Sequence, residues 1–234
     1  MTDAHCHVSC GDPSVRELLV GRDFFGVHPW ETLGTDPNFT AFFKGFREKL
    51  LANPSVGVGE IGLDRLKVRD IPPLMREVFE AQLALAFELR RPVVLHGAKC
   101  WGQVVKACEV AVQKWHLRRS AVDSRLSEAA ISNCPPGLLF HGFSRSDGLI
   151  PEIVKLNGFI SVGPAVLNDH AVNYRELVKK IPLDRLLVET DRTEANAAEC
   201  PSVRDVLAKV AELRGTSAAE LERITDENAN KFLI

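Results

Sequence analysis

The sequence predicts an α/β fold of the TIM-type (β/α) barrel class. Short apolar runs recur along the whole chain, helical patterns separate them, and most of the runs lead into a His, Glu or Asp. The runs lack the apolar and polar alternation of a sheet with one wet face, so they favour a parallel sheet covered by helices. They lie at 24–27, 56–63, 92–96, 137–143, 158–163 and 185–190, after a first strand at 2–7. A doubly wound sheet is the alternative, but no glycine-rich loop follows the first strand.

Two helices are indicated in detail. Residues 75–91 place Val78, Phe79, Leu83, Ala86 and Phe87 on one stripe, and an arginine pair lies at the C-terminal end of this helix. The final helix opens with the capping-box pattern Ser217-x-x-Glu220. Residues 113–136 are polar and predict either an irregular stretch or an extra helix. Because no linker interrupts the alternation, we expect a single domain over residues 1–234.

The composition restricts the function classes. The net charge of −2 argues against a protein that binds nucleic acid through bulk positive charge. The sequence has no apolar run of membrane-spanning length, it starts with polar residues, and its six cysteines are scattered without disulfide-framework spacing. We therefore expect a reduced, cytoplasmic protein with no membrane partner, and the oligomeric state is left open.

Polar residues follow the apolar runs at the expected strand ends, where (β/α) barrels keep their active sites. They are His5, His7, Glu60, His96, His141 and Asp191. Successive side chains of a strand point to opposite faces, so His5 and His7 share a face and Cys6 points away. A single histidine at a strand end is usually a hydrogen-bonded residue, but six such groups at five strand ends are hard to explain as packing.

Four imidazoles and two carboxylates are too many for one tetrahedral ion that also keeps a water. Shared between two ions roughly 3.5–4 Å apart, they leave positions for a hydroxide and for the oxygens of a phosphoryl or acyl group. We expect two divalent ions, with Zn and Mn favoured by the imidazoles and Mg still compatible with the carboxylates.

The motifs also carry a family likeness. The order of TDAHCH, GVHPW, GEIGLD, PVVLH, LLFHGFS, GFISVG, LLVETD and the C-terminal ENANKF resembles the TatD-type metal-dependent hydrolases, which are amidohydrolase-like barrels. The resemblance implies that His5 and His7 bind one ion, that Glu60 bridges both ions and that His96 and His141 bind the second. It also implies that Asp191 completes the site and handles the proton of the attacking water.

The resemblance further implies a phosphodiesterase, most often a deoxyribonuclease acting on DNA ends. The chain departs from the family between the first two motifs, where residues 8–25 are too few for a full βα unit; either residues 15–20 form a degenerate second strand or the barrel is incomplete, with about seven strands. Further departures, HGAKC at 96–100 and ETDRT at 189–193, place Lys99 and Arg192 near the expected site. These two residues, together with Arg145 and His28, are candidates for substrate binding.

Several alternatives remain at this point. The same site could hydrolyse an amide or a carboxylic ester, or the chain could be an accessory protein that keeps the barrel without turnover. Asp64 either orients a ligand histidine or caps the next helix. Trp30 either stacks on a base or packs at the rim, and packing is favoured.

Overall fold

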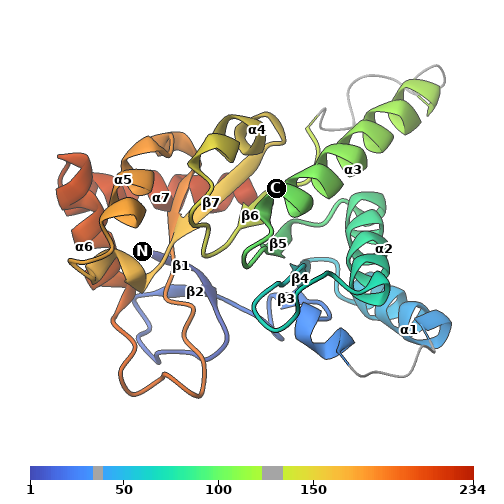
Figure 1. Cartoon of the computed structure of the whole chain (residues 1–234), viewed down its shortest axis with the longest axis horizontal. Helices are drawn as coiled ribbons and strands as arrows, with labels where there is room; N and C mark the ends of the chain where they lie inside the picture. Colours follow the sequence, from blue (N-terminus) through green and yellow to red (C-terminus); the bar gives the residue numbers. More distant parts are fainter. Residues whose placement is uncertain (34–38, 123–133) are drawn as a thin grey trace.

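A computed structural model describes residues 1–33, 39–122 and 134–234, in which parallel strands alternate with helices (Figure 1). Every strand expected from the apolar runs is present. The strands are β1 Thr2–Cys6, β2 Arg16–Leu19, β3 Phe24–Phe25, β4 Gly57–Gly62, β5 Val93–His96, β6 Leu138–Phe140, β7 Gly158–Val162 and β8 Leu186–Val188. The α-helices are α1 Phe39–Ala52, α2 Pro73–Leu89, α3 Trp101–Val122, α4 Ile150–Lys155, α5 Val172–Lys180, α6 Val203–Arg214 and α7 Ala218–Phe232.

The strands form a (β/α) barrel. The strands from β3 to β8 pair in sequence order as a parallel sheet, and β1 pairs with β2. A single bridge between Val20 and Phe24 joins β2 to β3. At the other seam the N–H of Asp191 donates to the carbonyl of His5 (3.0 Å), and the N–H of His7 donates to the carbonyl of Arg192 (2.8 Å).

The first part of the barrel is shortened on its outside. Residues 7–15 and 20–23, all of them described, connect β1, β2 and β3 by loops and turns without a helix. Of the two alternatives drawn from the sequence, the degenerate second strand is the correct one. The described chain therefore has eight strands rather than about seven.

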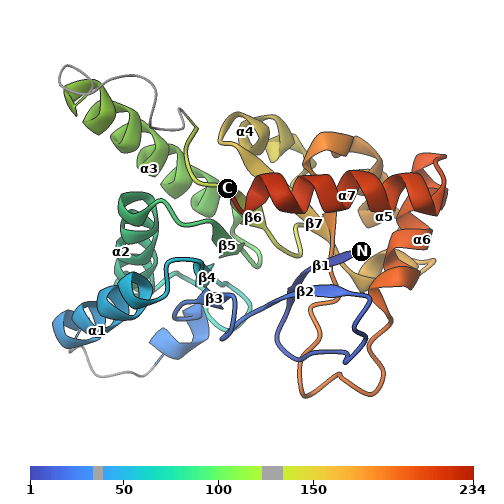
Figure 2. The same ribbon diagram turned by 180° about the vertical axis from the view of Figure 1, so that it is seen from behind.

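The interior of the barrel is apolar below the strand ends. On β5, β6 and β8, the residues Val94, Leu139 and Leu187 lie two positions before His96, His141 and Glu189, so each pair shares the inward face. With Phe24 and Phe159 they form one buried cluster, and Phe232 from the end of α7 closes it from below. Figure 2 shows α7 running across the back of the barrel. The polar groups above this cluster consequently lie at one end of the barrel.

The helices pack outside the strands. In α2 the predicted stripe of five apolar residues is buried, and the helix ends at Leu89, with Arg90 as a left-handed cap (φ 54°). The Ser217 hydroxyl accepts the Glu220 N–H at 3.1 Å, as the capping pattern predicts. Helix α3 extends to Val122, so part of the polar segment 113–136 is helical; residues 123–133 lie outside the described chain. No helix in the described ranges is both long and apolar enough to cross a bilayer.

Candidate metal centre

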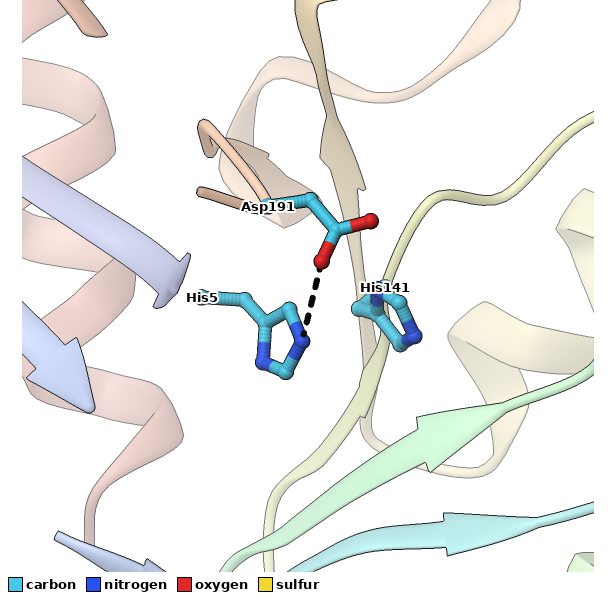
Figure 3. Close-up of side chains that lie close together, drawn as sticks. All are labelled: His5, His141 and Asp191. Atoms are coloured by element: carbon cyan, nitrogen blue, oxygen red, sulfur yellow. Dashed lines mark ion pairs between the residues drawn. The ribbon is translucent and has the colours of Figure 1, made fainter. Parts of the chain in front are cut away.

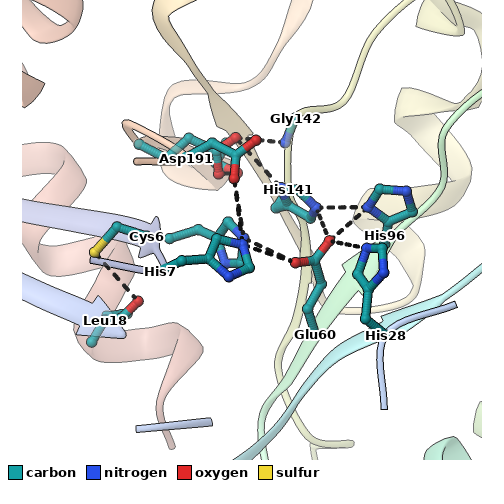
Figure 4. Close-up of polar contacts among 12 residues, drawn as sticks. Cys6, His7, Leu18, His28, Glu60, His96, His141, Gly142 and Asp191 are labelled. Atoms are coloured by element: carbon teal, nitrogen blue, oxygen red, sulfur yellow. Dashed lines mark hydrogen bonds and ion pairs between the residues drawn. The ribbon is translucent and has the colours of Figure 1, made fainter. Parts of the chain in front are cut away.

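Glu60 lies at the centre of the polar cluster. It belongs to β4 and its side chain is 3% exposed. Its Oε2 lies 3.3 Å from the Nε2 atoms of both His5 and His7. Its Oε1 lies 2.6 Å from His96 Nδ1 and 2.7 Å from His141 Nε2 (Figure 4). The two oxygens of one carboxylate therefore face two different pairs of imidazoles.

Asp191 lies on the side of His5 and His7. Its Oδ1 is 3.7 Å from His5 Nε2 and 3.6 Å from His7 Nε2, and its side chain is about half exposed. Figure 3 shows the carboxylate directed toward His5, with the His141 ring beside it; the ring centroids of His5 and His141 are 4.1 Å apart. The structure thus brings together the six side chains that the strand ends predicted.

The donor set fits a divalent cation on the side of His5. This imidazole is fully buried, and neither of its ring nitrogens has a hydrogen-bond partner among the described residues. Donor atoms bound about 2.0–2.1 Å from one tetrahedral ion lie about 3.3–3.4 Å apart. The contacts of His5 and His7 with Glu60 and Asp191 span 3.3–3.7 Å, close to that spacing.

His28 joins the opposite side of the cluster. It follows β3 as the N-cap of a short 3₁₀ helix, Pro29–Thr32, and its Nε2 lies 3.5 Å from Glu60 Oε1. Three groups of side chains in the described chain could hold a metal ion: His5, His141 and Asp191; His5, His7 and Glu60; and His28, Glu60 and His96. The sequence indicated His28 only as a substrate-binding residue, so its place among possible metal donors is an addition from the structure.

The electrostatics of the cluster favour bound positive charge. Burial would raise the pKa of Glu60, but the charge and hydrogen bonds of the surrounding histidines, His141 first, hold it well below its usual range. Burial would lower the pKa of His141, yet Glu60 and Glu189 raise it well above its usual value. Desolvation raises the pKa of Asp191, and the nearby His141 and His5 lower it in part. Positive charge beside Glu60 thus stabilises its buried carboxylate.

Two buried acids beneath the cluster were not singled out from the sequence. Glu189 Oε1 accepts the Gly142 N–H at 2.7 Å and lies 3.7 Å from His141 Nδ1. Asp3 accepts the N–H and the hydroxyl of Thr190, at 3.0 and 2.6 Å. Strand alternation could have revealed both, because Asp3 shares a face with His5 and Glu189 shares a face with Asp191.

Asp64 orients a histidine of the cluster, which is one of the two roles expected for it from the sequence. Its Oδ2 lies 2.7 Å from His96 Nε2, on the ring edge opposite Glu60. Its Oδ1 accepts the Leu66 N–H at 2.5 Å. Asp64 therefore fixes which nitrogen of His96 faces the cluster, as carboxylates commonly do for ligand histidines.

The three basic side chains considered for substrate binding differ in their surroundings. Arg145 lines a cleft of about 1070 Å³ together with Asp191 and Lys180. Lys99 is exposed in the turn between β5 and α3. The Nε of Arg192 is buried without a hydrogen-bond partner among the described residues, and this side chain is not among those lining the cleft. Their roles in substrate binding stay predictions, with Arg145 the best placed of the three.

Comparisons with known proteins identify the family of the chain. The family model "TatD related DNase" matches residues 21–233. The uncharacterized metal-dependent hydrolase YabD of Bacillus subtilis is 30% identical over 231 residues, covering 92% of this chain and 80% of YabD. The 3′-5′ ssDNA/RNA exonuclease TatD of Klebsiella pneumoniae is 32% identical over 216 residues, covering 87% and 73%. Among solved structures, the TatD homologue YJJV of Escherichia coli superimposes with a TM-score of 0.69 at 24% identity, covering 95% of this chain and 78% of YJJV.

Proposed function

The chain belongs to the family of TatD-related DNases and is a metal-dependent hydrolase acting on ester bonds, and from this premise we propose that residues 1–234 form one domain that cleaves phosphodiester bonds of nucleic acid at a two-metal centre. The observation that carries the proposal is Glu60, whose two oxygens face separate sets of imidazoles. A carboxylate with this arrangement suits the bridging position between two divalent ions.

The side chains divide between the two positions. His5 and His7 would hold one ion with Glu60 Oε2, and Asp191 would complete this half. His96 and His141 would hold the second with Glu60 Oε1, and His28 is a further donor on the same side. Zn, Mn and Mg all suit this donor set. Bound divalent ions would supply water that ionises near neutral pH and would neutralise charge on the phosphate.

The protein groups would do the remaining work. Asp191, half exposed beside the cleft, would accept the proton of the attacking water and return it to the leaving oxygen. Asp64 and Glu189 would keep His96 and His141 oriented toward Glu60. Arg145, on the wall of the same cleft, would pair with a substrate phosphate. The printed names of the TatD relatives support a DNA or RNA strand as the substrate.

The bridging role of Glu60 can be tested with Glu60→Ala and with Glu77→Ala, a control on the exposed side of α2. Elemental analysis should find two ions in the wild type and in the control, and one or none in Glu60→Ala. Hydrolysis of bis-p-nitrophenyl phosphate with Mn, Mg or Zn should disappear only in Glu60→Ala. Wild-type metal content in that variant would refute the bridge.

The same panel separates the alternatives. Faster metal-dependent hydrolysis of p-nitrophenyl esters or anilides than of the phosphodiester would assign the site to acyl chemistry. A wild-type protein without metal and without metal-stimulated hydrolysis would be an accessory protein. Digestion of a 3′-labelled single strand would then show whether the phosphodiesterase acts from strand ends.

A further inference from the structure

An exposed aromatic ring stands beside the metal centre. Trp30, in the 3₁₀ helix that His28 caps, is 41% exposed, whereas Trp101 and Trp115 are 4% and 8% exposed. The Trp30 ring meets the His28 ring edge to face, with centroids 5.0 Å apart. Since His28 Nε2 is 3.5 Å from Glu60, a single imidazole separates the exposed indole from the central carboxylate.

Residues of the cluster hold this ring in place. The Trp30 backbone N–H donates to His28 Nδ1 at 3.1 Å, which directs the other nitrogen of His28 toward Glu60. The Trp30 side chain also contributes to lowering the pKa of Asp64, the carboxylate that orients His96. The indole therefore lies against His28, a residue that itself contacts the cluster.

The Trp30 ring also contacts the cation of a long, exposed side chain. The Lys67 ammonium lies 3.5 Å from the Trp30 ring centroid, a cation–π contact. Lys67 is exposed. A flat ligand could displace this long side chain and leave its charge free for a neighbouring phosphate.

We propose that Trp30 is a stacking platform for one unpaired nucleobase of the substrate strand, next to the phosphodiester held at the metal centre, and that Lys67 pairs with an adjacent phosphate. This inference rests on the proposed function and adds a subsite to it. The platform lies on the His28 side of the cluster, and the cleft with Arg145 lies on the Asp191 side, so a strand crossing the centre would meet both. Stacking on an indole tolerates every base, which predicts a preference for single strands without a strict sequence requirement.

Binding can be measured independently of turnover, with metal-loaded protein and nuclease-resistant strands. One probe is a short phosphorothioate oligothymidylate, and the other is a strand of equal length and linkage built from abasic units. The wild type should bind the thymidylate about 5- to 150-fold more tightly than the abasic strand. Its tryptophan fluorescence should be quenched, because Trp30 is the exposed indole of the three.

Three variants sharpen the result. Trp30→Ala should remove both the base preference and the quenching, and Trp30→Phe should keep part of the preference. Lys67→Met should weaken both strands alike. Leu66→Ala, a matched change at a neighbouring side chain that is 54% exposed, should behave as the wild type.

The outcomes separate the two proposals. Equal affinity of the wild type for both strands, or an undiminished base preference in Trp30→Ala, would overturn the platform even if phosphodiesters are cleaved. Base-dependent binding that requires Trp30, in a protein that cleaves no phosphodiester, would support the platform and contradict the proposed activity.

Discussion

Asp3 offers a quantitative test of how the seam between β1 and β8 is built. Its carboxyl is 3% exposed and accepts the N–H and hydroxyl of Thr190. Burial raises the pKa of Asp3 from 3.8 to about 7, although the hydrogen bonds from Thr190 oppose the rise. The unfolded chain thus ionises this group at lower pH than the folded chain does. Between pH 4 and pH 7 the folded state binds more protons, so the stability contributed by this group falls as the pH rises.

The size of this loss of stability can be calculated for the pH range in which unfolding is measured. From pH 5 to above pH 7, about two pH units at about 1.4 kcal/mol each give a loss of about 3 kcal/mol. Asp3→Asn keeps an oxygen for the Thr190 N–H and offers an N–H₂ to its hydroxyl, and it does not titrate. In metal-free protein, the Asn variant should therefore gain about 3 kcal/mol relative to the wild type between pH 5 and pH 8.

The assay is urea unfolding of both proteins with a chelator present, at several pH values in this range. The difference between the two free energies of unfolding isolates residue 3, because His7, His96 and His141 titrate in both proteins. A difference that does not change with pH, or that favours the wild type at pH 8, would refute the reasoning.

Three other outcomes are expected. Gly62→Ala should lower the free energy of unfolding by at least about 2 kcal/mol, because φ is 154° there and a Cβ would lie 2.0 Å from the His96 carbonyl oxygen; urea midpoints check it. Arg214→Met should cost about 2 kcal/mol in the same assay, since its Nη1 contacts three backbone carbonyls after or at the end of α5 at 2.7–2.9 Å. Lys99→Ala should raise KM for a phosphodiester and leave metal content at the wild-type value, and an unchanged KM would make Lys99 a bystander.

The candidate site was predictable from the sequence for a geometric reason. In a parallel barrel every strand ends at the same face, so a residue identified only as the polar end of an apolar run is placed in space without knowing its partners. His5, Glu60 and Asp191 are far apart in the chain, yet each needed only its own strand to be found. The same rule, applied two residues earlier on the same face of a strand, would have indicated Asp3 and Glu189.

Contacts that depend on the path of the chain were harder to predict from the sequence. His28 follows a strand of only two residues, and the turn at Pro29 decides how near its ring comes to Glu60. The register of β1 against β8 joins residues about 190 positions apart, as in the pair of Asp3 with Thr190. No local pattern encodes such a pairing, because strand alternation fixes a face and not a neighbour.

The shortened start of the barrel removes outer cover and leaves the metal face intact. The N-terminal ammonium pairs with Glu222 and Asp226 of α7, each at 3.1 Å, and Arg16 of β2 donates to Asn230 of the same helix at 2.7 Å. Helix α7 thus holds β1 and β2 from outside, in a region where the connections lack helices. The metal donors come from strand ends inside the ring, so a helix lost on the outside takes no donor with it. The first two strands can therefore keep His5 and His7 in place as long as α7 stays docked.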